Sequence, residues 1–139
     1  MAVDPARLKA LSLFAPLSDR QRAKVAPHCH AVVIPQGEHL LDEGYSAYEF
    51  FVIEEGKAAV VSAGKHLRDL GPGDFLGEIA ILSQKARTAS VIAVSTVKAI
   101  AMSANDFRDM TESIPEVAKQ INEAAQERLE RDRLFGLEH

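Results

Sequence analysis

The sequence predicts a mainly β protein, a sandwich or jelly roll, with helices at both ends of the chain. Short apolar runs recur through the middle of the chain, and glycines separate these runs at frequent intervals. Helix-capping sequences with helical apolar spacing occur toward the two ends. Short strands that glycine turns interrupt this often are typical of sandwiches and jelly rolls.

The first part of the chain predicts two short helices. Asp4-Pro5 is a favourable helix start, because an aspartate can cap free N–H groups and a proline fits the first turn. Ser18 and Gln21 form a capping-box pattern, which predicts a second helix that ends near Ala26. The residues between the two helices are expected to form a tight turn with apolar side chains: Leu13, Phe14 and Leu17.

The middle of the chain predicts short strands joined by glycine turns, because apolar runs replace the helical spacing from residue 31 onward. The expected strands cover residues 32–34, 39–41, 50–53, 58–61, 67–70, 91–94 and 97–102. The expected turns contain Gly37, Gly44, Gly56, Gly64 and the run Gly71-Pro72-Gly73.

Helical signals return near the end of the chain. Ser103 is a capping residue that predicts a short helix, which carries Phe107 and Met110 toward the core. Ser113, followed by a proline and a glutamate, predicts a longer helix that reaches Leu134. The apolar stripe of this last helix is expected to be Val117, Ile121, Ala124, Ala125 and Leu129.

Length and composition indicate a single domain. The chain has 139 residues, of which 47% are hydrophobic and 26% are charged, and both fractions are ordinary for globular proteins. A net charge of −4 argues against a general nucleic-acid surface, so local groups would have to hold an anionic ligand. Leu137-Glu138-His139 resembles the start of a purification tag, and we therefore expect the domain to cover residues 1–136.

The expected location is the cytoplasm. Cys29 is the sole cysteine, which excludes an intrachain disulfide and suits a reducing compartment. No apolar run approaches the ~20 residues that a membrane-spanning helix needs, and the first residues lack the core of a signal peptide.

The stretch that says most about function is 77–90, GEIAILSQKARTAS. Gly77 lets the backbone approach a ligand closely, and a short helix that begins there would direct unpaired N–H groups at an anion. Arg87 adds a planar, permanently charged group that matches a phosphate. Glu78 can accept hydrogen bonds from the hydroxyl groups of a sugar. The stretch therefore predicts a ligand with a phosphate at one end and a sugar at the other.

This stretch resembles the phosphate-binding cassette of the cyclic nucleotide-binding domain family. In that family a Gly-Glu-hydrophobic-Ala run precedes Arg-Ser/Thr-Ala at the spacing seen here. The departure is Ala86, where the family often has proline, and this departure removes no group that contacts the ligand. The matching positions are Gly77, Glu78, Ala80, Arg87, Thr88 and Ala89.

The resemblance covers the whole layout and implies an eight-stranded antiparallel jelly-roll barrel with the cassette between its sixth and seventh strands. It implies N-terminal helices and two C-terminal helices, of which the last folds over the nucleotide as a lid. The stretch 37–56 is similar to the first half of the family's barrel, where Gly44 and Gly56 would be turn residues.

The resemblance implies a sensor that binds cyclic AMP, with cyclic GMP as the close alternative. The phosphate would lie between Arg87, Thr88 and the backbone N–H groups near Ile79 and Ala80, and Glu78 would accept the ribose 2′-hydroxyl. No cofactor and no metal are expected beside the nucleotide. The expected ligand-binding residues are Gly77, Glu78, Ile79, Ala80, Arg87, Thr88, Ala89 and Arg128.

Arg128 enters this set through the last helix. It lies about 20° off the apolar stripe, where a charged side chain must reach water or meet a partner. In bacterial cyclic nucleotide-gated potassium channels of the family, an arginine that corresponds to Arg128 contacts the adenine. Two alternatives remain open: a solvated arginine beside Asp132, or a base contact from Asp132 or Arg133 as in the catabolite-activator type.

The expected role is that of a regulatory domain of a larger protein such as an ion channel, and the alternative is the regulatory domain of a transcription factor or an enzyme. Residues 135–139 are too few for a helix-turn-helix, so this chain would not read DNA by itself. His28-Cys29-His30 lacks a further metal ligand at suitable spacing, and the metal motif of cupin enzymes does not match around it. We therefore expect no catalytic residue.

Overall fold

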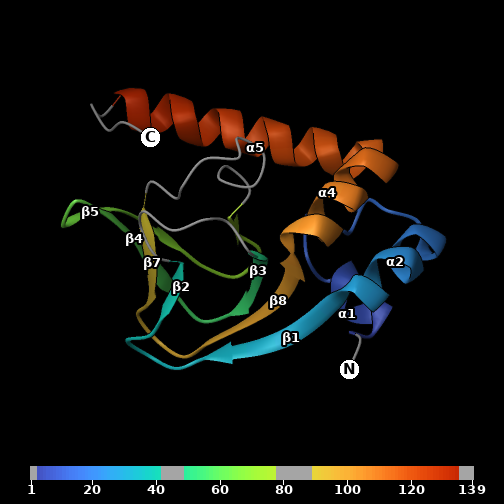
Figure 1. Ribbon diagram of the computed structural model, residues 1–139, viewed down its shortest axis with the longest axis horizontal. Helices are drawn as coiled ribbons and strands as arrows, with labels where there is room; N and C mark the ends of the chain where they lie inside the picture. Colours follow the sequence, from blue (N-terminus) through green and yellow to red (C-terminus); the bar gives the residue numbers. More distant parts are fainter. Residues whose placement is uncertain (1–2, 42–48, 78–88, 135–139) are drawn as a thin grey trace.

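The computed structural model describes residues 3–41, 49–77 and 89–134. Two four-stranded sheets form the centre of the molecule, and the helices gather at one end and along one side of the strands (Figure 1). In the described residues the elements are α1 (Pro5–Lys9), α2 (Asp19–Val25), η1 (Ala26–His28), β1 (Cys29–Ile34), β2 (His39–Leu41), β3 (Glu49–Glu55), β4 (Ala58–Ser62), β5 (Lys65–Leu70), β6 (Phe75–Leu76), β7 (Ser90–Ala93), β8 (Val97–Ser103), α4 (Ala104–Ser113) and α5 (Pro115–Leu134).

Each sheet is antiparallel throughout. The first sheet has the strand order β1-β8-β3-β6, and the second has the order β2-β7-β4-β5. Strands that are neighbours in the sequence often lie in different sheets, so the chain passes repeatedly from one sheet to the other. This arrangement confirms the predicted mainly β jelly roll with flanking helices.

The buried side chains form two clusters that share the first sheet. The inner core lies between the two sheets, and the outer core lies between the first sheet and the helices. In β3, Phe51 and Ile53 belong to the inner core, whereas Phe50 and Val52 belong to the outer core. The ring of Phe50 stacks on that of Phe107 in α4, with centroids 4.5 Å apart. The middle of the first sheet, at β3 and β8, is therefore buried on both faces.

The two N-terminal helices begin where the sequence predicts. Asp4 caps α1, and Ser18 and Gln21 form the expected capping box of α2. Arg22, at 5% exposure, donates from one nitrogen to three carbonyl groups of the turn between α1 and α2 and pairs with Asp19 through the other. The arginine thereby supplies hydrogen-bond donors to carbonyl groups of this tight turn. The carbonyl acceptors are those of Phe14, Ala15 and Leu17.

Gly56 is a turn residue between β3 and β4, as the resemblance implied. It has φ +93°, a conformation that L side chains rarely adopt. A Cβ at this position would lie 2.2 Å from the carbonyl oxygen of Thr96, in the turn that precedes β8. The glycine is thus required twice, by the backbone angle and by the close approach of a second segment. Gly44, its predicted counterpart, lies outside the described residues.

The two C-terminal helices are also confirmed. Ser103 caps α4, whose Phe107 and Met110 are buried in the outer core. Val117 and Ile121 of α5 are fully buried there as well, and the side chains of the last two predicted stripe residues, Ala125 and Leu129, lie outside the described residues. In the part of the chain that the structure describes, no helix combines the length and hydropathy that a membrane span requires.

Candidate functional site

The predicted phosphate cassette joins the two sheets. It leaves the first sheet after β6, at an edge, and enters the second sheet at β7, which lies between β2 and β4. At its start Gly77 has φ +96°, a value that favours glycine. At its end Ala89 packs against the inner core. The cassette thus begins directly after Leu76 of the inner core, and its end packs against the same core.

The remaining cassette residues of the predicted site are not described. Gly77 and Ala89 are placed, and α5 includes position 128 as expected, but the side chain of Arg128 lies outside the described residues. In Figure 1, α5 runs from α4 along one side of the molecule toward the side on which β4, β5 and β7 lie. The predicted site residues outside the described ranges are Glu78, Ile79, Ala80, Arg87 and Thr88.

A row of residues crosses the inner face of the second sheet close to the end of the cassette. Val91, two residues after Ala89, pairs with Leu41 on one side and with Val60 on the other. Val60 in turn pairs with Arg68 of β5. The first three members of this row are buried in the inner core. The fourth is a half-buried arginine, which the sequence analysis did not single out.

The pairing of β5 with β4 places Arg68 on the inner face, and an irregularity in β5 adds Leu67 to the same face. Val60 pairs with Arg68 but its neighbour Val61 pairs with His66, so Leu67 is an extra residue in this strand. Leu67 packs against the inner core, and Leu70 is buried in it. His66 and Asp69 are exposed. This burial pattern places Leu67 and Arg68 together on the inner face, which a strictly alternating strand would not allow.

The outer face of β5 carries an ion cluster that supports this orientation. Nε2 of His66 lies 2.8 Å from Oδ1 of Asp69, and Nζ of Lys57 lies 3.2 Å from Oδ2 of the same carboxylate. Hydrogen bonds from His66 and Lys57 hold the pKa of Asp69 below its ordinary value. The two β5 residues that flank the Leu67-Arg68 pair therefore contact each other on the outside of the sheet.

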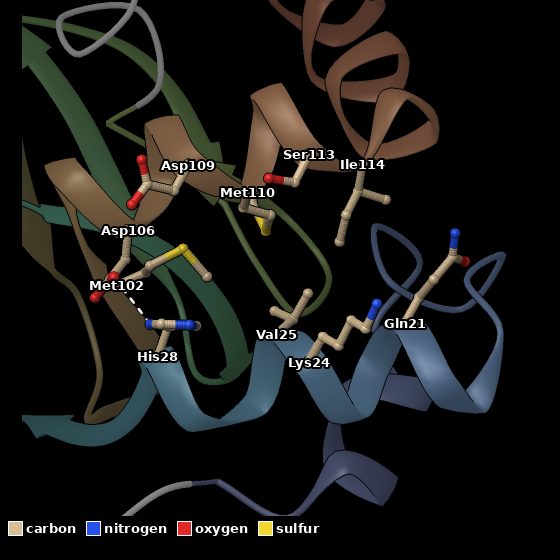
Figure 2. A pocket seen from close by; sticks show the side chains of 10 residues that line it. All are labelled: Gln21, Lys24, Val25, His28, Met102, Asp106, Asp109, Met110, Ser113 and Ile114. Atoms are coloured by element: carbon tan, nitrogen blue, oxygen red, sulfur yellow. Dashed lines mark ion pairs between the residues drawn. The ribbon is translucent and has the colours of Figure 1, made fainter.

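A pocket of about 390 Å³ lies elsewhere, between α2 with η1 and α4 (Figure 2). Val25, Met102 and Met110 form its apolar lining. Nδ1 of His28 lies 2.9 Å from Oδ1 of Asp106, and Asp109 also lines the pocket. Lys24 also lines the pocket, but the two carboxylates leave no excess of positive charge there for a phosphate. This pocket is therefore a poor place for the anionic end of the predicted ligand.

His28-Cys29-His30 forms no metal site. Burial raises the pKa of the Cys29 thiol to about 12, so the thiol stays protonated near neutral pH and is a poor metal ligand. Nε2 of His30 lies 3.8 Å from Oε1 of Glu49, whereas His28 pairs with Asp106, so the two histidines have different partners. Within residues 3–41, 49–77 and 89–134, no three His, Cys, Asp or Glu side chains come together as metal ligands would.

Three comparisons identify relatives of the chain. It is 31% identical over 119 residues to a cyclic nucleotide-gated potassium channel of Rhizobium etli, an alignment that covers 86% of this chain and 33% of the channel. It is 38% identical over 88 residues to a cGMP-dependent protein kinase of Toxoplasma gondii, covering 63% of this chain and 9% of the kinase. The chain thus spans a third or less of these two relatives.

Solved structures agree with these sequence relatives. The regulatory domain of Toxoplasma gondii PKA, crystallised with cAMP, superposes with a TM-score of 0.77 at 25% identity, covering 88% of this chain and 48% of that chain. The sequence model of the family described as "Cyclic nucleotide-binding domain" matches residues 31–113, from β1 to the end of α4. With this match over more than half of its length, the chain belongs to the cyclic nucleotide-binding domain family.

Proposed function

We propose that this chain is a sensor domain that binds a cyclic purine nucleotide, with cyclic AMP as the first candidate and cyclic GMP as the second. One observation carries the proposal: the GEIAILSQKARTAS motif begins at a left-handed glycine after β6, and near its end Ala89 packs against the inner core. A motif with two fixed ends on different sheets has the structural context that a phosphate cassette requires.

The proposed roles divide the ligand into three parts. Arg87, Thr88 and the backbone N–H groups near Ile79 and Ala80 hold the cyclic phosphate, which carries one negative charge. Glu78 accepts the ribose 2′-hydroxyl. Arg128 of α5 contacts the purine and closes the site. Two observations support this arrangement: Gly77 directly follows Leu76 of the inner core, and Ala89 packs against the same core.

The proposed output is a change in the position of the C-terminal helices. α4 follows directly on β8 and packs into the outer core, and the buried start of α5 packs into the same core. A ligand that contacts both the cassette and α5 favours one arrangement of these helices, because it binds the two arrangements unequally. No catalytic group is needed for this role.

We further propose that the domain, residues 1–136, regulates a larger protein, and an ion channel is the first candidate. The Rhizobium etli relative is a potassium channel, and its alignment with this chain covers 33% of the length of the channel. The Toxoplasma gondii kinase is likewise much longer than the matched segment. A chain of this size therefore corresponds to one part of each relative.

The first test is the choice between cyclic and linear nucleotides. Cyclic AMP or cyclic GMP is expected to bind at least about tenfold more tightly than the linear 5′-monophosphate, a difference of about 1.4 kcal/mol. A cyclic phosphate is a diester with one negative charge, whereas the linear 5′-monophosphate carries up to two. A cassette that neutralises one charge would leave the second charge of the linear nucleotide without a partner. Titration calorimetry measures both affinities. If neither cyclic nucleotide produces heat or a thermal shift, the proposed function is wrong.

The second test concerns the proposed base contact of α5. Arg128→Ala is expected to weaken binding about tenfold and to speed ligand release, because a residue that closes the site opposes escape more than it aids entry. Lys119→Ala removes a charge from an exposed position of the same helix and is expected to change neither rate. Stopped-flow measurements on cyclic AMP and on a base-modified analogue complete a double-mutant cycle. If Arg128→Ala loses the same affinity for both nucleotides, Arg128 does not contact the base but has a general role in holding α5.

A further inference from the structure

We propose that the pocket between α2 with η1 and α4 binds a small zwitterion, a molecule in which an apolar chain separates an ammonium group from a carboxylate. The pocket has a volume of about 390 Å³, which is within the usual range for small-molecule sites. Its lining residues lie within 21–28 and 102–114, so it is distinct from the predicted phosphate cassette at 77–90. The proposal does not depend on the proposed function.

The walls of the pocket are two helix faces that an ion pair joins at one end. Nδ1 of His28 lies 2.9 Å from Oδ1 of Asp106. Lys24 lies about one turn before His28, and Asp109 lies about one turn after Asp106. Figure 2 shows Lys24 on the wall formed by α2 and Asp109 on the wall formed by α4. The pocket therefore carries one positive and one negative charge on opposite walls.

These two charges can bind a ligand. Within residues 3–41, 49–77 and 89–134, neither Lys24 nor Asp109 forms an ion pair. Asp106 differs, because Oδ1 faces His28 and Oδ2 accepts a hydrogen bond from Oγ of Ser103 at 3.1 Å. Asp109 is thus the pocket carboxylate that can accept hydrogen bonds from an ammonium group, and Lys24 can donate to a carboxylate.

The surface between the two charges is apolar. Val25 and Met110 lie between the two charged side chains in Figure 2, and Met102 and Ile114 complete the apolar lining. A chain of methylene groups that covers this surface leaves water, which favours binding. Methionine side chains adapt to the shape of what they contact, so the pocket can accept a flexible chain.

The balance of charges favours a zwitterion over a simple amine or a simple acid. An amine would pair with Asp109 but would meet the like charge of Lys24, and for an acid the two roles are exchanged. A molecule with both groups pairs with both side chains and carries no net charge. Lys24 and Asp109 are exposed, so each contact is expected to change the affinity by less than about fivefold.

The test is a titration of the full chain with 6-aminohexanoate, followed by nuclear magnetic resonance. Two of the three methionines of the chain, Met102 and Met110, line the pocket, so their methyl signals report its occupancy. Both signals are expected to shift with one common affinity. Hexylamine and hexanoate, each of which lacks one of the charges, are expected to bind about threefold to fivefold more weakly. Shorter and longer ω-amino acids show which chain length fits the gap between the two charges.

Single substitutions assign the two charges. Asp109→Asn is expected to reduce the affinity for 6-aminohexanoate to that for hexanoate, and Lys24→Met is expected to reduce it to that for hexylamine. Asp109→Glu and Lys24→Arg keep the charges and should keep the preference for the zwitterion. Glu112→Gln and Lys9→Met remove the same kinds of charge from exposed positions outside the pocket lining and should leave the affinity unchanged. Thermal unfolding of each variant reports the state of the fold.

Two results would overturn the proposal. If neither methionine signal shifts with 6-aminohexanoate, the pocket does not bind a zwitterion of this kind. If hexylamine or hexanoate binds as tightly as 6-aminohexanoate, one charge is sufficient, and the assigned ligand class is wrong. Neither result concerns the cassette, so the affinity for cyclic nucleotides tests the proposed function separately.

Discussion

Arg87→Leu is expected to lower the affinity for the cyclic nucleotide about tenfold to more than a hundredfold, and this is the largest effect we expect on ligand binding. The substitution removes a charge-assisted contact to the phosphate, which contributes about 1.5–3 kcal/mol. The net charge of the chain is −4, so no general positive field compensates for the loss. Calorimetry with the preferred nucleotide measures the change.

The control for this variant is Arg20→Leu, which removes the same charge from an exposed position of α2. It is expected to bind as the original chain does. The loss in Arg87→Leu should be the same for every intact cyclic phosphate, whatever the base, because the contact is to the phosphate. If a folded Arg87→Leu protein binds with unchanged affinity, the phosphate lies elsewhere, and the cassette assignment is wrong.

Gly56→Ala is expected to have the largest effect on stability. The new methyl group would lie 2.2 Å from the carbonyl oxygen of Thr96 and would also strain a backbone with φ +93°. Strain and clash together should lower the free energy of unfolding by about 2–4 kcal/mol. For a chain of this length the midpoint of thermal unfolding should fall by roughly 10 °C. Calorimetric or spectroscopic melting measures this change.

Gly37→Ala is the matched control for the close approach. Gly37 has φ +89°, nearly the angle of Gly56, but a Cβ there would meet no atom within 4 Å. Gly37→Ala therefore introduces the conformational strain without the clash. It should lower the free energy of unfolding by about 1 kcal/mol. The difference between the two variants measures how tightly the β3–β4 turn packs on the turn before β8. Equal losses would contradict the packing described for Gly56.

Most of the architecture could be predicted from local signals. Capping residues such as Ser18 and Ser103 set the helix starts, and the strand at 39–41 has the predicted bounds. β6 was not predicted from the residues, because two apolar residues, Phe75 and Leu76, give no alternation to detect. β1 begins at Cys29, earlier than predicted, because buried Cys29 is followed by exposed His30 and Ala31 and not by an apolar run.

The candidate site could be predicted only as far as its motif. The spacing of Gly77, Glu78 and Arg87 is visible in the sequence, and it indicates a phosphate and a sugar. Arg68 could not be found in the same way, since Lys65–Leu70 mixes charged and apolar residues without a regular alternation. Leu67 is an extra residue in the pairing with β4, so Leu67 and Arg68 share the inner face, and a single strand carries no sign of such an irregularity.

The burial of β3 and β8 on both faces has a consequence for how these strands find their register. A strand with one solvent-exposed face is held in place by polarity, because a slip of one residue would bury its polar side chains. Between Lys98 and Ser103 β8 lacks this safeguard, since these four residues alternate between two apolar clusters. They alternate in volume instead: Ala99 and Ala101 face the inner core, whereas Ile100 and Met102 face the helices. A slip would overfill one core and leave holes in the other, so size selects the register of this sheet.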